Sequence, residues 1–246
     1  MTAARLKYIA LLLAALFMAI FLYHKGPLPQ EQWYHQFIDT RIFLGIPNAM
    51  DVLSNIFFVI VGILGMREVG NVLGLDTKKS WWWFFFSILL IAPGSAYYHW
   101  SPNDTTLIWD RLPMSMGFMG LYIVLLCEHI HLKFEKALYP TLLLGIFSVV
   151  TWVITNDLRF YYWVQFSSFI TIPIILLLFK SRYGKKYLYV VTLVFYGLAK
   201  WTEVKDKEIF YATSEMISGH TLKHILAAIG LLALWWMVRT RNKFNA

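Results

Sequence analysis

Long apolar stretches separated by short polar connections constrain this chain more than any other feature of its sequence. Hydrophobic residues make up 59% of the 246 residues and charged residues 15%, and the mean hydropathy is +0.56. A soluble domain of this length needs far more charge to cover its surface, whereas a helix that crosses a bilayer needs about 20 mostly apolar residues. Such stretches lie at about 8–23, 51–69, 81–99, 108–127, 137–155, 160–179, 187–203 and 219–238. The sequence therefore predicts an all-α, polytopic membrane helical bundle.

The first apolar stretch predicts a membrane anchor helix over residues 1–25. It follows Arg5 and Lys7, as the apolar part of a signal peptide does. Its far end, residues 19–23, lacks the small-x-small pattern of a cleavage site. We therefore expect an uncleaved helix. The single cysteine, Cys127, excludes a disulfide within the chain.

The basic residues predict the orientation of the helices. Of the 22 Lys and Arg residues, fourteen fall on one set of alternate connections: Arg5, Lys7, Arg67, Lys78, Lys79, Lys133, Lys136, Lys180, Arg182, Lys185, Lys186, Arg239, Arg241 and Lys243. By the positive-inside rule this set faces the cytoplasm, and so do both termini. Because topology explains the net charge of +8, no nucleic-acid partner is expected.

Four ionisable residues at the ends of apolar stretches need a functional or structural reason, because charge is costly in lipid. They are His99, Asp110, His220 and His224. In the predicted topology the third helix ends near His99 on the outer side, and the loop 100–109 leads to Asp110 on the same side. The eighth helix begins there with the other two histidines. All four are therefore expected in one layer near the outer (periplasmic, lumenal or extracellular) face.

The histidines have the spacing of metal ligands. His220 and His224 are four residues apart, which stacks both imidazoles on one face of a helix. Zinc binds neutral imidazole nitrogen, and a catalytic zinc has three protein ligands and one water. With His99 as the third ligand, the residues predict a metal centre. The alternative is a pair of interfacial histidines that face water.

The segments 94–95 and 51–55 contain small and polar residues for which a structural role is expected. Ser95 lies one turn before the third-helix histidine on the same face, and by itself it is typical of a small packing residue. Gly94 is expected to let a neighbouring helix approach closely. Asp51 is expected to be a helix N-cap, and Ser54 and Asn55 are expected to bond to a neighbouring helix.

Together these residues resemble the signature of the alkaline ceramidases. The runs 94–99, Gly-Ser-Ala-Tyr-Tyr-His, and 110–114, Asp-Arg-Leu-Pro-Met, resemble the Ser-x3-His and Asp-x-x-Pro-Met elements of that family. Residues 54–55 resemble the Ser-Asn that opens the first core helix of these enzymes. Residues 220–224 resemble the paired histidines of their last helix. The progestin and adiponectin receptors, from the same superfamily, look similar at the same motifs.

The resemblance implies a seven-helix core over 45–240, to which the helix in 1–25 is an addition. It implies three zinc ligands: His99, His220 and His224. It also implies hydrolysis of a lipid amide such as ceramide, with zinc-bound water as the nucleophile. In that reaction zinc lowers the pKa of its water from about 16 to near 7. Asp110 is expected to act as general base and then acid, and Ser95 is expected to donate a hydrogen bond to the oxyanion.

The sequence departs from the eukaryotic ceramidases at their acidic, calcium-binding N-terminal cluster. Those enzymes carry a Glu shortly before the first core helix, where residues 46–51 read Ile-Pro-Asn-Ala-Met-Asp here. Glu31, Asp39 and Asp51 are the only acidic residues nearby. A calcium site is therefore in doubt, and so is a sphingolipid substrate.

Two other functions stay open. A seven-helix lipid receptor or sensor with a structural zinc uses the same three histidines, so the sequence does not separate it from a hydrolase. A transporter is expected to place charge near the bilayer midplane, and the sequence offers no convincing charge there.

Reporter fusions test the orientation. A reporter fused after Ala246 is expected to lie in the cytoplasm, and one inserted in 100–109 on the opposite side, because the basic residues alternate between connections. A reporter active only in the cytoplasm and one active only outside it measure the two positions. The same side for both positions would contradict the predicted layout.

Overall fold

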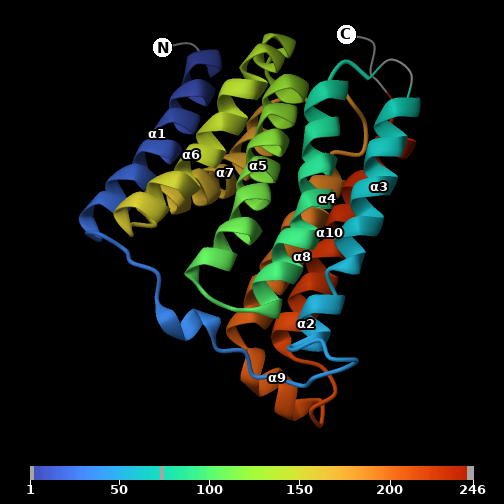
Figure 1. The fold of residues 1–246 in the computed structure, drawn as a ribbon. Coiled ribbons are helices and arrows are strands. Elements are labelled where there is room, and N and C mark those ends of the chain that lie inside the picture. Colours follow the sequence, from blue (N-terminus) through green and yellow to red (C-terminus); the bar gives the residue numbers. More distant parts are fainter. Residues whose placement is uncertain (1–2, 73–74, 243–246) are drawn as a thin grey trace.

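The fold is an all-helical bundle, as the sequence predicts. A computed structural model describes residues 3–72 and 75–242, and in these residues it contains helices and a single isolated β-bridge. The α-helices are α1 (Ala3–His24), α2 (Ala49–Leu53), α3 (Ile56–Asn71), α4 (Lys78–Trp100), α5 (Asp104–His129), α6 (Leu138–Thr155), α7 (Arg159–Leu178), α8 (Tyr187–Val204), α9 (Asp206–Ala212) and α10 (Gly219–Thr240) (Figure 1). The 3-10 helices are η1 (Gln32–His35) and η2 (Leu132–Ala137). Every predicted apolar stretch is helical over most of its length.

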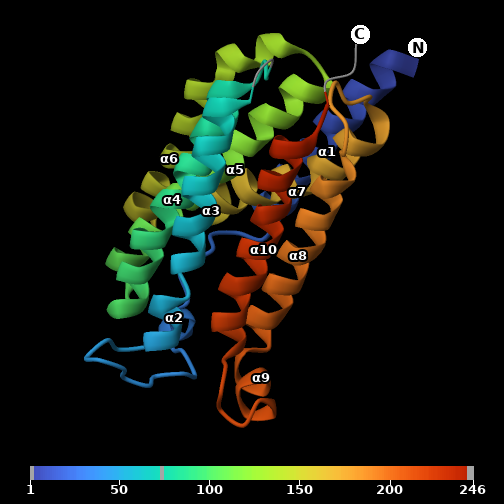
Figure 2. The same cartoon turned by 90° about the vertical axis from the view of Figure 1, so that its right-hand side faces the viewer.

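Six spans among the described residues are long and apolar enough to cross a membrane: Arg5–His24, Ala49–Asn71, Asp104–His129, Leu132–Thr155, Arg159–Leu178 and Gly219–Thr240. The chain is therefore a multi-pass membrane protein. In the bundle α4 packs between α3 and α5, and α10 packs between α3 and α8. Helices α6 and α7 cover the other side of α5, while α1 lies outside the bundle against α7 (Figures 1 and 2).

Two differences from the predicted helices lie near the histidine end of the bundle. The stretch 51–69 is broken between α2 and α3, because the side chains of Ser54 and Asn55 both bond to the carbonyl oxygen of Asp51 and so compete with the helical ladder. Helix α5 begins at residue 104 and not near 108, so much of the expected outer loop 100–109 is helical. A capping box sets this start, since Asn103 accepts from the Thr106 amide and the Thr106 hydroxyl accepts from the Asn103 amide.

Gly94 brings α4 and α5 into backbone contact at the end of the bundle that carries the histidines. A Cβ atom on Gly94 would meet the carbonyl oxygen of Trp109 on α5. This contact confirms the close approach that the sequence predicts at Gly94. It also sets Asp110, the residue after Trp109, next to Ser95.

The opposite end of the bundle is closed by a buried ion pair. Glu128, at the end of α5, is fully buried and accepts hydrogen bonds from Nη1 and Nη2 of Arg241, both at 2.7 Å. Its oxygens also accept from Trp81 Nε1 at 2.8 Å, from Tyr189 Oη at 3.0 Å and from Thr77 Oγ1 at 3.0 Å. Because all of its partners come from other segments, Glu128 ties α4, α5, α8 and the end of α10 together.

Substitution of Gly94 tests the contact between α4 and α5. Gly94→Ala is expected to destabilise the protein by about 1–3 kcal/mol, the usual cost of overpacking, because the new methyl group would overlap a backbone carbonyl. Gly197→Ala on α8 is the control, because nothing lies within 4 Å of its added Cβ and alanine favours a helix by about 1 kcal/mol over glycine. Thermal unfolding in detergent measures both. Equal unfolding temperatures for the two variants would contradict the tight contact.

Candidate metal centre

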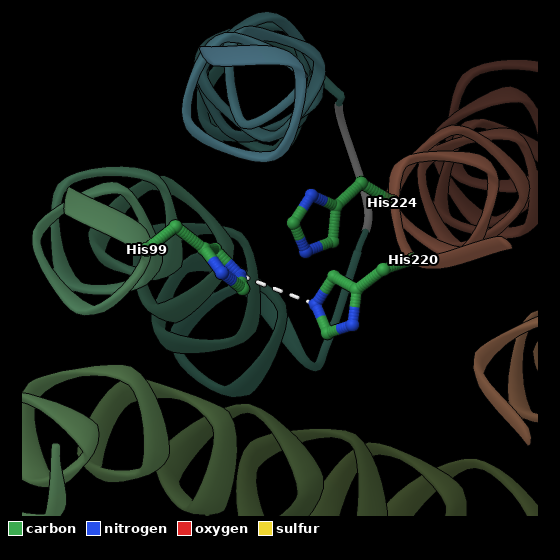
Figure 3. Close-up of side chains that lie close together, drawn as sticks. All are labelled: His99, His220 and His224. Carbon is green, nitrogen blue, oxygen red and sulfur yellow. Dashed lines mark hydrogen bonds between the residues drawn. The ribbon is translucent and has the colours of Figure 1, made fainter. Parts of the chain in front are cut away.

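Three histidines from two helices meet inside the bundle. His99 lies near the end of α4, and His220 and His224 lie in the first two turns of α10 (Figure 3). One nitrogen from each imidazole lies within 4.8 Å of the others, and the side chains are 1%, 4% and 3% exposed. The structure therefore brings together the three residues that the sequence predicts as ligands, and the i, i+4 spacing puts the α10 pair on one face.

The spacing of two of the three imidazoles fits a tetrahedral metal ion. Two nitrogens bound to zinc at 2.0–2.1 Å lie about 3.3–3.4 Å apart in tetrahedral geometry. The Nε2 atoms of His99 and His220 are 3.3 Å apart. The other nitrogen of His99, Nδ1, is buried and has no hydrogen-bond partner among the described residues. Because one nitrogen of each imidazole lies within 4.8 Å of the others, these residues can hold a metal ion.

A hydrogen bond from α2 fixes the tautomer of His224. The Ser54 hydroxyl lies 3.1 Å from the carbonyl oxygen of Asp51 and 2.7 Å from Nδ1 of His224. Its single hydrogen goes to the carbonyl, which can only accept, so the hydroxyl oxygen accepts from Nδ1–H. This arrangement leaves the Nε2 lone pair of His224 free for a metal, as outer partners of metal-bound histidines commonly do. It confirms that Ser54 bonds to a neighbouring helix, whereas Asn55 donates within its own turn.

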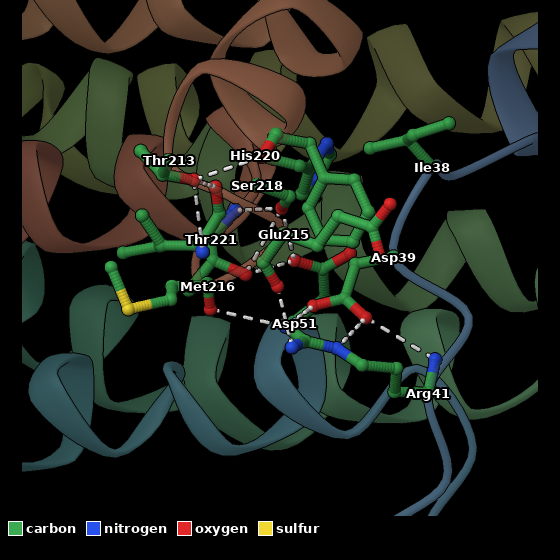
Figure 4. A network of polar contacts seen from close by, with 12 residues as sticks. Ile38, Asp39, Arg41, Asp51, Thr213, Glu215, Met216, Ser218, His220 and Thr221 are labelled. Carbon is green, nitrogen blue, oxygen red and sulfur yellow. Dashed lines mark hydrogen bonds and ion pairs between the residues drawn. The ribbon is translucent and has the colours of Figure 1, made fainter.

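Asp51 holds the start of α10 and does not cap its own helix. It is the third residue of α2, whose N-cap is Asn48, so the predicted N-cap role of Asp51 is wrong. Its Oδ1 accepts from Thr221 Oγ1 at 2.6 Å and from Ser218 Oγ at 3.3 Å (Figure 4). The sequence did not reveal this role because the partners lie about 170 residues away. Asp51 therefore positions the turn of α10 that carries His220 and His224.

The first loop covers the histidines and is bound to the segment between α9 and α10. Arg41 bonds to Asp39 through Nε at 2.7 Å and Nη2 at 2.6 Å, and its Nη1 donates to the carbonyl oxygen of Glu215 at 2.6 Å (Figure 4). The bond to Asp39 raises the pKa of Arg41. Phe37, in the same loop, packs its ring 4.7 Å from His99 and 4.6 Å from His220, centroid to centroid. The loop thus excludes water from one side of the site.

Ser95 and Asp110 lie beside the histidines on adjoining helices. Ser95 is buried one turn below His99 on α4, and its side chain is within hydrogen-bonding range of the Asp110 carboxylate on α5. Asp110 is partly buried and interacts electrostatically with Lys223 on α10. The structure therefore brings the five predicted site residues to one end of the bundle, and the catalytic roles of Ser95 and Asp110 stay predictions.

A partly buried group of charges next to the histidines was not predicted. Lys223 Nζ lies 2.8 Å from His220 Nε2 and 2.9 Å from Glu203 Oε1. Glu203 also binds Lys200 at 2.7 Å and accepts from the Tyr34 hydroxyl at 3.4 Å. In the sequence Lys200 and Lys223 read only as basic residues away from the cytoplasmic connections. Their i, i+3 spacing to Glu203 and His220 is the signal that could have found them.

No protein-family model matches the sequence, and no curated protein matches it. The fold and the histidines define a helical, multi-pass membrane protein with a buried three-histidine group that can hold a metal ion.

Substitution of the α10 histidines tests the metal site. The wild-type protein is expected to bind about one divalent ion per chain. His220→Ala and His224→Ala are each expected to lose most of it, because a site with three protein ligands rarely survives the loss of one. His131→Ala is the control, since His131 caps η2 and is not part of the group. Metal analysis of purified protein gives the occupancy. Full occupancy in either α10 variant would show that the ligands are wrongly assigned.

Proposed function

We propose that the chain is a zinc-dependent hydrolase of lipid amides, similar to the alkaline ceramidases. The observation that carries the proposal is the pairing of Ser95 with Asp110 beside a group of three histidines. Three imidazoles leave a fourth position of a tetrahedral ion for water or substrate, which distinguishes catalytic from structural zinc sites. Zinc held there supplies Lewis acidity, which activates water and polarises a carbonyl group.

Two side chains of the protein can transfer the proton of the attacking water and bind the carbonyl oxygen of the amide. Asp110 is a carboxylate that can take a proton from the attacking water and deliver it to the leaving amine, the two transfers that amide hydrolysis needs. The Ser95 hydroxyl, one turn from His99, can donate a hydrogen bond to the carbonyl oxygen as negative charge develops on it. The contact at Gly94 keeps these two side chains together.

The surroundings of the site suit an amide that carries a long acyl chain. The histidines lie at the end of helices whose outer faces are apolar, with exposed residues such as Ile56, Ile60 and Ile63 along α3. An acyl chain can stay among such faces while the amide reaches the polar residues at the end of the bundle. Lipid is the medium from which such a substrate would enter.

Substitution of Asp110 tests the proposal. Asp110→Asn is expected to keep its metal and its fold but to lose about 10²–10⁴ in the rate of lipid-amide hydrolysis, the usual contribution of general acid–base catalysis. Asp157→Asn is the control, because Asp157 lies in the turn between α6 and α7 and binds Arg159 and the Leu28 amide. Metal analysis and a hydrolysis assay over a panel of N-acyl amides give the two readouts.

Two results would contradict the proposal. Loss of metal together with activity in Asp110→Asn would place Asp110 among the metal ligands or their supports and would remove it as the base. Wild-type protein that holds zinc and binds lipid amides, yet cleaves none of the panel, would favour the receptor or sensor function.

A further inference from the structure

Arg111 is a buried cation without a carboxylate partner. Its side chain is 5% exposed, and its Nη2 donates to the neutral Oε1 atom of Gln30 at 2.6 Å. Its Nη1 is buried and has no hydrogen-bond partner within residues 3–72 and 75–242, and it forms no ion pair there. An isolated charge in an apolar interior costs several kcal/mol. An anion bound to the Arg111 guanidinium would therefore be strongly stabilising.

Aromatic rings hold the guanidinium in place and provide no anionic hydrogen-bond partner. The guanidinium carbon lies 4.4 Å from the ring centre of Trp152, 5.1 Å from that of Tyr161 and 5.7 Å from that of Tyr34. Each contact attracts a cation through the ring quadrupole. The rings orient the planar group, while its Nη1 hydrogens stay available. A guanidinium fixed in this way is suited to binding two oxygens of a carboxylate or phosphate.

The lysines beside the histidines add positive charge to the same region. Lys200 and Lys223 share one carboxylate, Glu203, so this group keeps a net positive charge. Tyr34 connects the two groups, because its hydroxyl donates to Glu203 and its ring lies against Arg111. Burial raises the pKa of the Tyr34 phenol and the charge of Glu203 raises it further, whereas Lys200 and Arg111 oppose the rise.

Asp110 does not take the place of the missing partner. It precedes Arg111 on α5, and consecutive side chains of a helix point about 100° apart. Asp110 attracts Arg111 electrostatically but bonds to Ser95 on α4, whereas the Arg111 guanidinium bonds to Gln30 in the first loop and packs against rings of α6 and α7. A ligand that reaches both side chains would contact the Asp110 carboxylate at one end and the Arg111 guanidinium at the other.

We infer that the amide substrate carries an anionic oxygen group, a carboxylate or a phosphate, on the amine side of its amide bond, and that Arg111 binds this group. Lys200 strengthens the positive potential at the same place. The substrate class is then an N-acyl amino acid or an N-acylated amino-alcohol phosphate. This inference rests on the proposed amide hydrolysis, because it names the substrate of that reaction.

Matched ligand pairs test the inference on the intact, metal-loaded protein in neutral detergent. The binding probes are dodecylsulfonyl glycine and dodecylsulfonyl glycinamide, whose sulfonamide is not hydrolysed and which carry a carboxylate and a neutral carboxamide of the same size. A second pair, dodecylsulfonyl ethanolamine phosphate and dodecylsulfonyl ethanolamine, distinguishes phosphate from carboxylate. Calorimetry gives the dissociation constants, and the corresponding N-dodecanoyl amides give the rates of hydrolysis.

The wild-type protein is expected to bind the anionic member of one pair about ten to a hundred times more tightly, the range of a charge-assisted hydrogen bond. Arg111→Gln is expected to lose this preference while its affinity for the neutral member stays unchanged. Arg111→Lys is expected to keep part of the preference, because lysine retains the charge without the planar fork. Arg67→Gln, at an exposed position near the far end of α3, is expected to change nothing.

Equal affinity for both members of both pairs in the wild type would overturn the inference, and so would a preference that survives in folded Arg111→Gln. If Arg111→Gln does not fold, an undiminished preference in Arg111→Lys overturns it instead. The proposed function fails separately. A preference that depends on Arg111 without hydrolysis of any N-dodecanoyl amide would support the anion site and refute the hydrolase. Hydrolysis of the N-dodecanoyl amides without a preference for the anionic ligands would support the hydrolase and refute the anion site.

Discussion

Polar side chains buried among apolar helices need partners, and this need organises the end of the bundle that carries the histidines. The first turn of α10 is bonded through Ser218 and Thr221 to Asp51 on α2, and the His220 amide donates to Asp206 on α9 at 2.7 Å. Because these bonds do not involve the imidazoles, they position the backbone that carries two of the three histidines and leave the rings themselves free. The local order of the site comes from this network.

The arrangement of α5 has a consequence for chemistry. One turn of this helix presents Asp110 toward Ser95 on α4 and Arg111 toward the first loop. If Asp110 accepts the proton and Arg111 binds the anion as proposed, these two groups are consecutive residues of one rigid helix. The separation between the amide and the anionic group of a substrate would be set by the helix itself. Rigid helical placement of this kind favours selection by length as well as by charge.

Much of the fold could be predicted because apolar length is a strong signal in a membrane protein. The helices and the common depth of His99, His220 and His224 followed from it. The break before α3 could not be predicted, because it depends on hydroxyl and amide groups that compete for one carbonyl oxygen. The partners of Asp51, and the contacts of Glu203 with Lys223 and Tyr34, could not be predicted either. Each is recognised only when distant segments are placed side by side, and a single sequence carries no record of which cation meets which carboxylate.

The buried pair of Glu128 and Arg241 bears on the depth of the histidines. Arg241 follows α10 directly and is fixed to α5, while the other end of α10 is fixed by Asp51. A helix of 22 residues is about 33 Å long at 1.5 Å per residue. Because both ends are fastened, α10 cannot slide along its axis without breaking a buried ion pair or a buried carboxylate contact. The histidines are therefore held at a constant height above the opposite face, even where the surrounding bilayer varies in thickness.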